Sequence, residues 1–65
     1  MQRGRLSRVK LEPGTQVRAM YDRDGKFYDG IIAKYFGASS MYQVDWEGEN
    51  GAYSFVKPEN VSLEV

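Results

Sequence analysis

The sequence predicts an all-β domain in which five short strands form a small barrel or sandwich. At 65 residues the chain is long enough for one domain only. Short runs rich in β-branched and aromatic residues alternate with turns that contain glycine, proline or asparagine, which is the pattern of an all-β domain. A helical fold is not expected, because apolar and polar side chains alternate as they do along strands.

Turn-forming residues set the expected boundaries of each strand. A turn at residues 12–14 (EPG) precedes the first strand. The expected strands cover residues 16–21, 26–36, 41–46, 52–56 and 61–65. Gly25 is expected to take a positive φ in the first hairpin turn, and residues 57–60 (KPEN) are expected to form one helical turn. Gly30 lies within the longest strand, which indicates a close approach of another segment or a sharp bend.

The core has to supply the stability of this domain, because the chain has no cysteine and therefore no disulfide. Aromatic side chains bury large areas and are the natural source of such a core. Phe27, Phe36 and Phe55 carry no polar group on their rings, so we expect them in the core.

Charge divides the chain into a basic arm over residues 1–12 and a folded domain over residues 13–65. The basic residues of the arm are Arg3, Arg5, Arg8 and Lys10. Residues 12–65 hold five basic and nine acidic residues, which gives a net charge of −4. An acidic domain argues against a broad nucleic-acid-binding surface. The arm itself is interpreted as a disordered segment, an additional strand or a weak contact to nucleic acid.

The residue types argue against an enzyme. The chain has no histidine and no cysteine, so it lacks the common nucleophile–base pairs and the usual zinc ligands. Glu47 and Glu49 could form a carboxylate pair, but their place in a polar turn favours two solvated side chains. No glycine-rich loop precedes a helix, as a phosphate-binding loop would. We therefore expect no catalysis, no cofactor and no metal site.

Nothing in the sequence predicts a membrane segment or a secretion signal. No apolar run approaches the ~18 residues that a membrane-spanning helix needs, and no continuous apolar stretch follows the basic start of the chain. The absence of cysteine is compatible with a reducing, intracellular compartment.

Four aromatic residues near turns point to a binding function. Tyr21 ends the first expected strand and Tyr28 lies near the start of the second, so the hairpin places them close together. Trp46 ends the third expected strand, and Tyr53 lies near the start of the fourth. If the two hairpins lie side by side, these rings can form a cage that binds a methylated ammonium by cation–π attraction and methyl packing. Each ring taken alone fits the core equally well.

Polar residues in the turn after Trp46 are expected at the rim of this cage. They are Glu47, Glu49 and Asn50. A carboxylate there can accept a hydrogen bond from a methylated ammonium group that still carries a proton.

Several stretches of the sequence resemble a Tudor domain. They are residues 17–21 (VRAMY), 24–25 (DG), 27–32 (FYDGII), 42–47 (YQVDWE) and 55–61 (FVKPENV). The first hairpin is the most specific part, and the resemblance extends over residues 13–64. Agenet and chromo-barrel domains, which are also SH3-like barrels, share parts of this pattern. The turn at residues 47–51 is longer than is usual in the family.

The resemblance implies a five-stranded SH3-like barrel that reads methylated lysine or arginine, often on histone tails. By position in the family pattern, the cage would consist of Tyr21, Tyr28, Trp46 and Tyr53, with Glu49 or Asn50 as the polar residue of the turn. The implied setting is the nucleus, where the domain would be one module of a larger chromatin protein. The acidic turn favours a methylated lysine, whereas Asn50 suits a methylarginine cage.

Two other functions stay open on the sequence alone. One is a nucleic-acid-binding SH3-like barrel, in which the arm contacts phosphates and exposed rings stack on bases. The other is a protein-interaction barrel without a cage, for example one that pairs a strand with its partner. Burial of all four rings would favour the second of these.

Overall fold

The computed structural model describes residues 11–63 of the chain. The predicted arm falls almost wholly on residues 1–10, so Arg3, Arg5, Arg8 and Lys10 lie outside the described residues. Of the arm, Leu11 and Glu12 are described. Leu11 packs against the core, and its backbone N–H donates a hydrogen bond of 3.0 Å to the hydroxyl of Tyr42.

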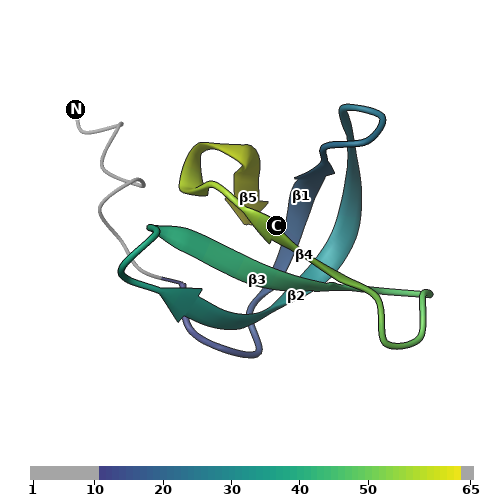
Figure 1. Ribbon diagram of the computed structural model, residues 1–65. Helices are drawn as coiled ribbons and strands as arrows, with labels where there is room; N and C mark the ends of the chain where they lie inside the picture. Colours follow the sequence, from purple (N-terminus) through teal and green to yellow (C-terminus); the bar gives the residue numbers. More distant parts are fainter. Residues whose placement is uncertain (1–10, 64–65) are drawn as a thin grey trace.

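Five antiparallel strands form one sheet, as the all-β prediction requires (Figure 1). The elements are β1 (Gln16–Tyr21), β2 (Lys26–Phe36), β3 (Met41–Trp46), β4 (Tyr53–Val56), a 3₁₀ turn η2 (Pro58–Asn60) and β5 (Val61–Leu63). The order in the sheet is β4-β3-β2-β1-β5. The first three strands have the predicted bounds, and β4 begins at Tyr53 rather than at residue 52. Within residues 11–63, no helix is long and apolar enough to cross a membrane.

The sheet curls strongly but is not closed. A register shift between Ile32 and Lys34 marks a bulge in β2, the longest strand, and bulges increase local twist and bending. The curl brings β1 and β4, which are not neighbours in the sheet, into contact across the interior. Among the described residues no strand pairing joins β4 to β5, so the structure is a curled open sheet.

The core lies on the inner face of the curled sheet. Its buried residues are Val17, Ala19, Ile32, Tyr42, Val44 and Val56. They come from alternate positions of β1, β2, β3 and β4, because successive side chains of a strand point to opposite faces.

The prediction that phenylalanines form the core is wrong. Phe27 is 41% exposed and Phe55 is 51% exposed, while Phe36 is half-buried and lies outside the core cluster. Strand alternation explains this result, since the inward positions of β2 and β4 are taken by Ile32 and Val56. The buried ring of the core belongs instead to Tyr42.

Gly30 is a point of close approach, as the sequence predicts. It pairs with Trp46 across β2 and β3. A Cβ atom at this position would lie 2.5 Å from Cγ1 of Val44 and 3.1 Å from the carbonyl oxygen of Asp45. The missing side chain therefore lets β3 and the Trp46 indole lie close against β2.

Candidate functional site

Two hairpin turns place the aromatic residues at one end of the sheet. Tyr21 and Lys26 close the β1–β2 hairpin, and Ala19 pairs with Tyr28, so Tyr21 and Tyr28 are diagonal neighbours. Gly30, two residues beyond Tyr28, pairs with Trp46. The register of three adjacent strands thus brings the two tyrosines and the tryptophan together.

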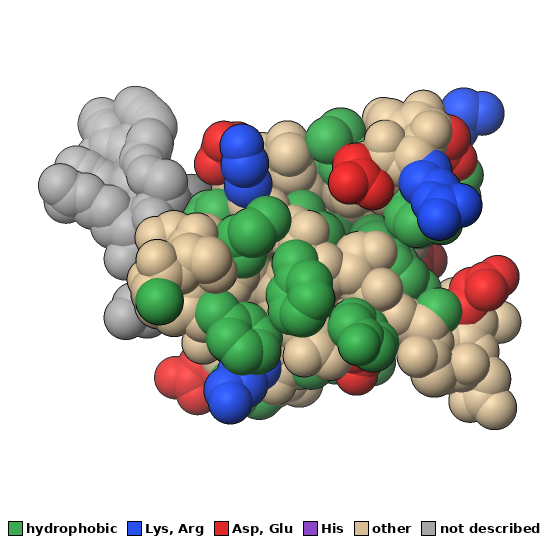
Figure 2. All heavy atoms as spheres, viewed as in Figure 1, with side chains coloured by type: hydrophobic (Ala, Val, Ile, Leu, Met, Phe, Trp, Pro, Cys, Tyr) green, Lys and Arg blue, Asp and Glu red, His purple; other side chains and the backbone are tan. Residues whose placement is uncertain are grey.

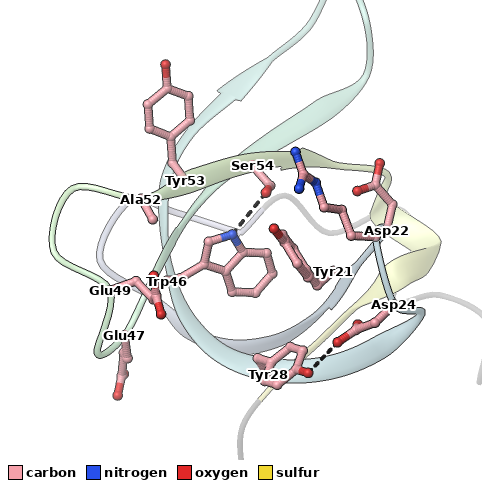
Figure 3. Close-up of a pocket in the computed structure, with 11 residues that line it drawn as sticks. Tyr21, Asp22, Asp24, Tyr28, Trp46, Glu47, Glu49, Ala52, Tyr53 and Ser54 are labelled. Atoms are coloured by element: carbon pink, nitrogen blue, oxygen red, sulfur yellow. Dashed lines mark hydrogen bonds between the residues drawn. The ribbon is translucent and has the colours of Figure 1, made fainter.

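Tyr21, Tyr28 and Trp46 form an aromatic triad of nearly perpendicular rings (Figure 3). The ring centroids of Tyr21 and Tyr28 lie 6.2 Å apart, with an angle of 80° between the planes. Trp46 lies 5.8 Å from Tyr21 and 6.4 Å from Tyr28, with interplanar angles of 83° in both cases. Every ring of the triad contacts the other two, so the arrangement is not a chance pairing of two exposed side chains.

Two hydrogen bonds hold rings of the triad in place. Nε1 of Trp46 donates a bond of 2.9 Å to Oγ of Ser54, on the neighbouring strand β4. The hydroxyl of Tyr28 donates a bond of 2.5 Å to Oδ2 of Asp24, in the β1–β2 turn. The other carboxylate oxygen of Asp24 accepts a bond of 2.9 Å from the backbone N–H of Lys26. A fixed ring loses less conformational entropy when a ligand binds.

The triad borders a pocket of about 530 Å³ between the two hairpin turns, visible as a recess in Figure 2. Its charged lining residues are Asp22, Asp24, Glu47 and Glu49 on the acidic side and Arg23 on the basic side. Four negative charges against one positive charge give this lining a net charge of −3. Aromatic faces and an acidic lining together favour a cationic ligand.

The structure does not bring Tyr53 into the triad. Tyr53 borders the pocket, but its ring is turned away from the three other rings (Figure 3). It is 56% exposed and lies 5.8 Å from the ring of Phe55. The cause is strand alternation, because Ser54 faces the Trp46 indole and its neighbour Tyr53 therefore faces outward.

The predicted rim residues take three different positions. Glu49 lines the triad pocket beside Trp46. Glu47 also belongs to the lining, but its side chain is directed away from the rings and accepts a hydrogen bond of 3.2 Å from Nε2 of Gln16. Asn50 does not line the triad pocket; it borders a shallower one formed by the β3–β4 turn.

Sequence reasoning missed the β1–β2 turn and Ser54 as parts of the site. Asp22, Arg23 and Asp24 line the pocket from the side opposite the predicted rim. The signal for Asp24 was present, because it lies four residues before Tyr28 across a tight turn and its side chain can reach back along the hairpin. No local pattern points to Ser54, whose role depends on the pairing of β3 with β4.

The Tyr28–Asp24 hydrogen bond shifts the pKa values of both groups. It lowers the pKa of Asp24 below its ordinary value, with a further contribution from the Lys26 N–H, and it raises the pKa of Tyr28. The pair is intact when Asp24 is charged and Tyr28 is neutral. Its stabilising effect is therefore present between about pH 4 and pH 10. It is lost as the pH falls through the lowered pKa of Asp24, or rises through the raised pKa of Tyr28.

We expect Asp24→Asn to lower the pKa of Tyr28 toward its ordinary value, because an amide oxygen accepts the hydrogen bond without carrying a charge. Titration of the Tyr28 ring resonances by NMR above pH 9 measures this directly. Asp22→Asn is the matched control, since Asp22 lines the same pocket and is not a hydrogen-bond partner of Tyr28. An unchanged Tyr28 midpoint in Asp24→Asn would show that the hydrogen bond does not set this pKa.

The site has the chemistry of a binding pocket. Its side chains offer ring faces, carboxylates and hydroxyl groups to a ligand, which suits recognition of a cation. Within residues 11–63, no group of three His, Cys, Asp or Glu side chains has the arrangement of a metal site. Comparison of the sequence with protein-family models and with curated proteins finds no match.

Proposed function

We propose that this protein binds a methylated lysine side chain in the pocket of the aromatic triad, as a Tudor-type reader with an SH3-like barrel fold. The fold part of the proposal is supported by five antiparallel strands, the strong curl of the sheet and the 3₁₀ turn before β5. The functional part is supported by the triad and its acidic surroundings. The cellular role that follows is recruitment to methylated protein tails, on histones in the nucleus.

The observation that carries the proposal is the near-perpendicular arrangement of three rings. Three such planes correspond to three adjoining walls of a box. At centroid separations of 5.8 to 6.4 Å, a cation centred in such a box would lie roughly 4 Å from each ring face, well within the ~6 Å range of cation–π attraction. A trimethylammonium group also packs its methyl groups against the rings.

The charges around the pocket support the same ligand. The net charge of −3 attracts an ammonium ion and repels a phosphate backbone. Asp24 is ionised near neutral pH, and its hydrogen bonds, which lower its pKa, keep it ionised at lower pH than an ordinary aspartate. The exposure of Tyr28 and Tyr53, at 43% and 56%, does not fit a barrel whose four rings are all buried. These features favour the reader over the two alternative functions.

Lysine is favoured over arginine by the position of Asn50. This residue is the one in the turn that would suit a methylarginine cage, and it lies outside the triad pocket. The charged groups that do line the pocket are mostly carboxylates, which pair with a compact ammonium group.

The test is a titration of the protein with Nα-acetylated lysine amides that carry zero, one, two or three methyl groups, followed by amide chemical shifts in NMR. We expect methylation-dependent shifts at Tyr21, Tyr28 and Trp46, with a dissociation constant of about 0.1–1 mM for the preferred state, because one side chain in one pocket gains only a few kcal/mol. Dimethylarginine derivatives are titrated alongside.

A neutral analogue provides the control for charge. In this analogue a carbon atom replaces the nitrogen of trimethyllysine, so the shape is kept and the charge is lost. We expect it to bind much more weakly than trimethyllysine. Equal binding of the neutral and charged compounds would argue against cation–π recognition, and the absence of shifts with every methylated compound would refute the proposed function.

A further inference from the structure

A row of aromatic rings, two of them exposed and one half-buried, leads away from the triad pocket along the outer face of the sheet. Tyr53 borders the pocket and contacts Phe55, which in turn contacts Phe36. The ring centroids are separated by 5.8 Å for the first pair and by 5.6 Å for the second. We call these three residues the aromatic strip; Figure 2 shows hydrophobic side chains gathered on this face over β4 and its neighbours.

The strip differs from scattered exposed apolar residues, which are common on protein surfaces. Its rings contact one another edge to face, and they come from strands that are separated by β3. Phe55 and Tyr53 remain 51% and 56% exposed despite these contacts. Phe27, which is 41% exposed, lies outside the strip and serves below as a reference residue.

The two ends of the strip carry opposite charge. At the Tyr53 end lies the acidic lining of the triad pocket, with a net charge of −3. At the Phe36 end, the ammonium group of Lys34 lies 5.1 Å from the ring centroid of Phe36. A complementary ligand therefore has a cationic group at one end, an apolar group in the middle and an acidic group at the other end.

We propose that the aromatic strip is a second subsite for the peptide that carries the methylated lysine, and that it binds an apolar side chain two to four residues away from that lysine. This inference rests on the proposed function. The spacing follows from the ring separations, because an extended chain advances by roughly 3.3 Å per residue and each step along the strip matches about two residues. An acidic residue next to the apolar one pairs with Lys34.

This subsite gives the domain a basis for choosing among methylated sequences. The triad pocket alone contacts only the modified side chain, which is the same in every methylated tail. Additional apolar contact on the strip distinguishes one flanking sequence from another and strengthens binding. The strip therefore acts as a specificity determinant.

The experiment compares short Gly/Ser peptides that each carry one trimethyllysine. In the first Leu peptide, Leu-Glu starts three positions after the trimethyllysine. In the second, Glu-Leu ends three positions before it. Each Leu peptide has a counterpart with Ser in place of Leu. Nα-acetyl-trimethyllysine amide is the ligand that reaches only the pocket. We expect the Leu peptide of one orientation to bind about five- to tenfold more tightly than its Ser counterpart.

Two variants locate the effect. Phe55→Ser is expected to remove the preference for Leu and to leave the affinity for the amino acid derivative unchanged. Phe27→Ser, a change of the same kind on the same outer face, is expected to alter neither quantity. Because both side chains are exposed, both variants are expected to fold. In the wild-type protein, Leu-dependent amide shifts at Phe55 and at Gln43, its partner on β3, give a readout independent of mutation.

The same measurements distinguish failure of the strip subsite from failure of the proposed methyllysine binding. If the amino acid derivative binds and the Leu and Ser peptides bind equally in both orientations, the strip is not a subsite and the proposed function stands. If a Leu preference survives Phe55→Ser, the apolar side chain binds elsewhere and the inference is overturned. If neither the derivative nor any peptide binds, both proposals are wrong.

Discussion

Tyr28→Ala is expected to weaken binding of trimethyllysine by roughly ten- to a hundredfold, because it removes one complete wall of the aromatic triad and the cation–π contact of that wall. The domain is expected to stay folded, since Tyr28 is 43% exposed and does not belong to the core cluster. NMR titration gives the affinity, and thermal unfolding followed by circular dichroism confirms that the sheet persists.

Tyr28→Phe separates the ring from its hydroxyl group. This variant keeps the aromatic wall and loses the hydrogen bond to Asp24, so we expect affinity close to that of the wild type. Phe27→Ala is the matched control for the loss of a ring, because Phe27 directly precedes Tyr28 in β2, has similar exposure and does not line the pocket. Loss of binding in Phe27→Ala, or full binding in Tyr28→Ala, would contradict the assigned role of the triad.

Trp46 is a less suitable target for the same test. It forms part of the triad, yet it also packs against the core cluster and pairs with Gly30. Substitution of Trp46 by alanine is therefore expected to disturb packing as well as the pocket. Any loss of affinity in that variant would combine a lost wall with a disturbed core.

Gly30→Ala is expected to destabilise the domain by roughly 1–3 kcal/mol, the usual range for forcing an extra methyl group into a packed site. The new Cβ would lie 2.5 Å from Cγ1 of Val44 and 3.1 Å from the backbone oxygen of Asp45, so β2 and β3 would have to move apart. A domain of this length has a total stability of only about 3–5 kcal/mol, and the loss would be a large part of it. Urea unfolding measures the change.

Gly37→Ala is the control for this second prediction. Gly37 lies in the β2–β3 turn, where an added Cβ meets no atom within 4 Å and φ is not in the left-handed region. We expect its free energy of unfolding to change by less than about 0.5 kcal/mol. Similar unfolding curves for the two variants would mean that β2 and β3 can separate at Gly30 without cost.

The order of the strands along the chain could be derived from local pattern. Turn residues such as Gly25 and the KPEN segment mark where each strand stops, and alternation within the strands identifies Val17 and Ala19 as inward residues. The same local rules place Tyr21 beside Tyr28, because a short hairpin determines which residues pair. Trp46 lies beside these two tyrosines because β2 pairs with β3 in a register that sets Gly30 opposite Trp46.

The sequence by itself therefore determined the all-β class and the strands with most of their limits, and it predicted four rings at one end of the sheet, of which three meet. Only the tertiary structure decided that Tyr53 belongs to the aromatic strip and not to the triad, and that Asn50 lies outside the pocket. It also decided that Asp24 and Ser54 hold two rings of the triad by hydrogen bonds. The physical reason is the range of the interactions. Alternation and turn geometry act over a few residues, whereas the side on which a ring emerges depends on how distant strands pair and how the whole sheet curls.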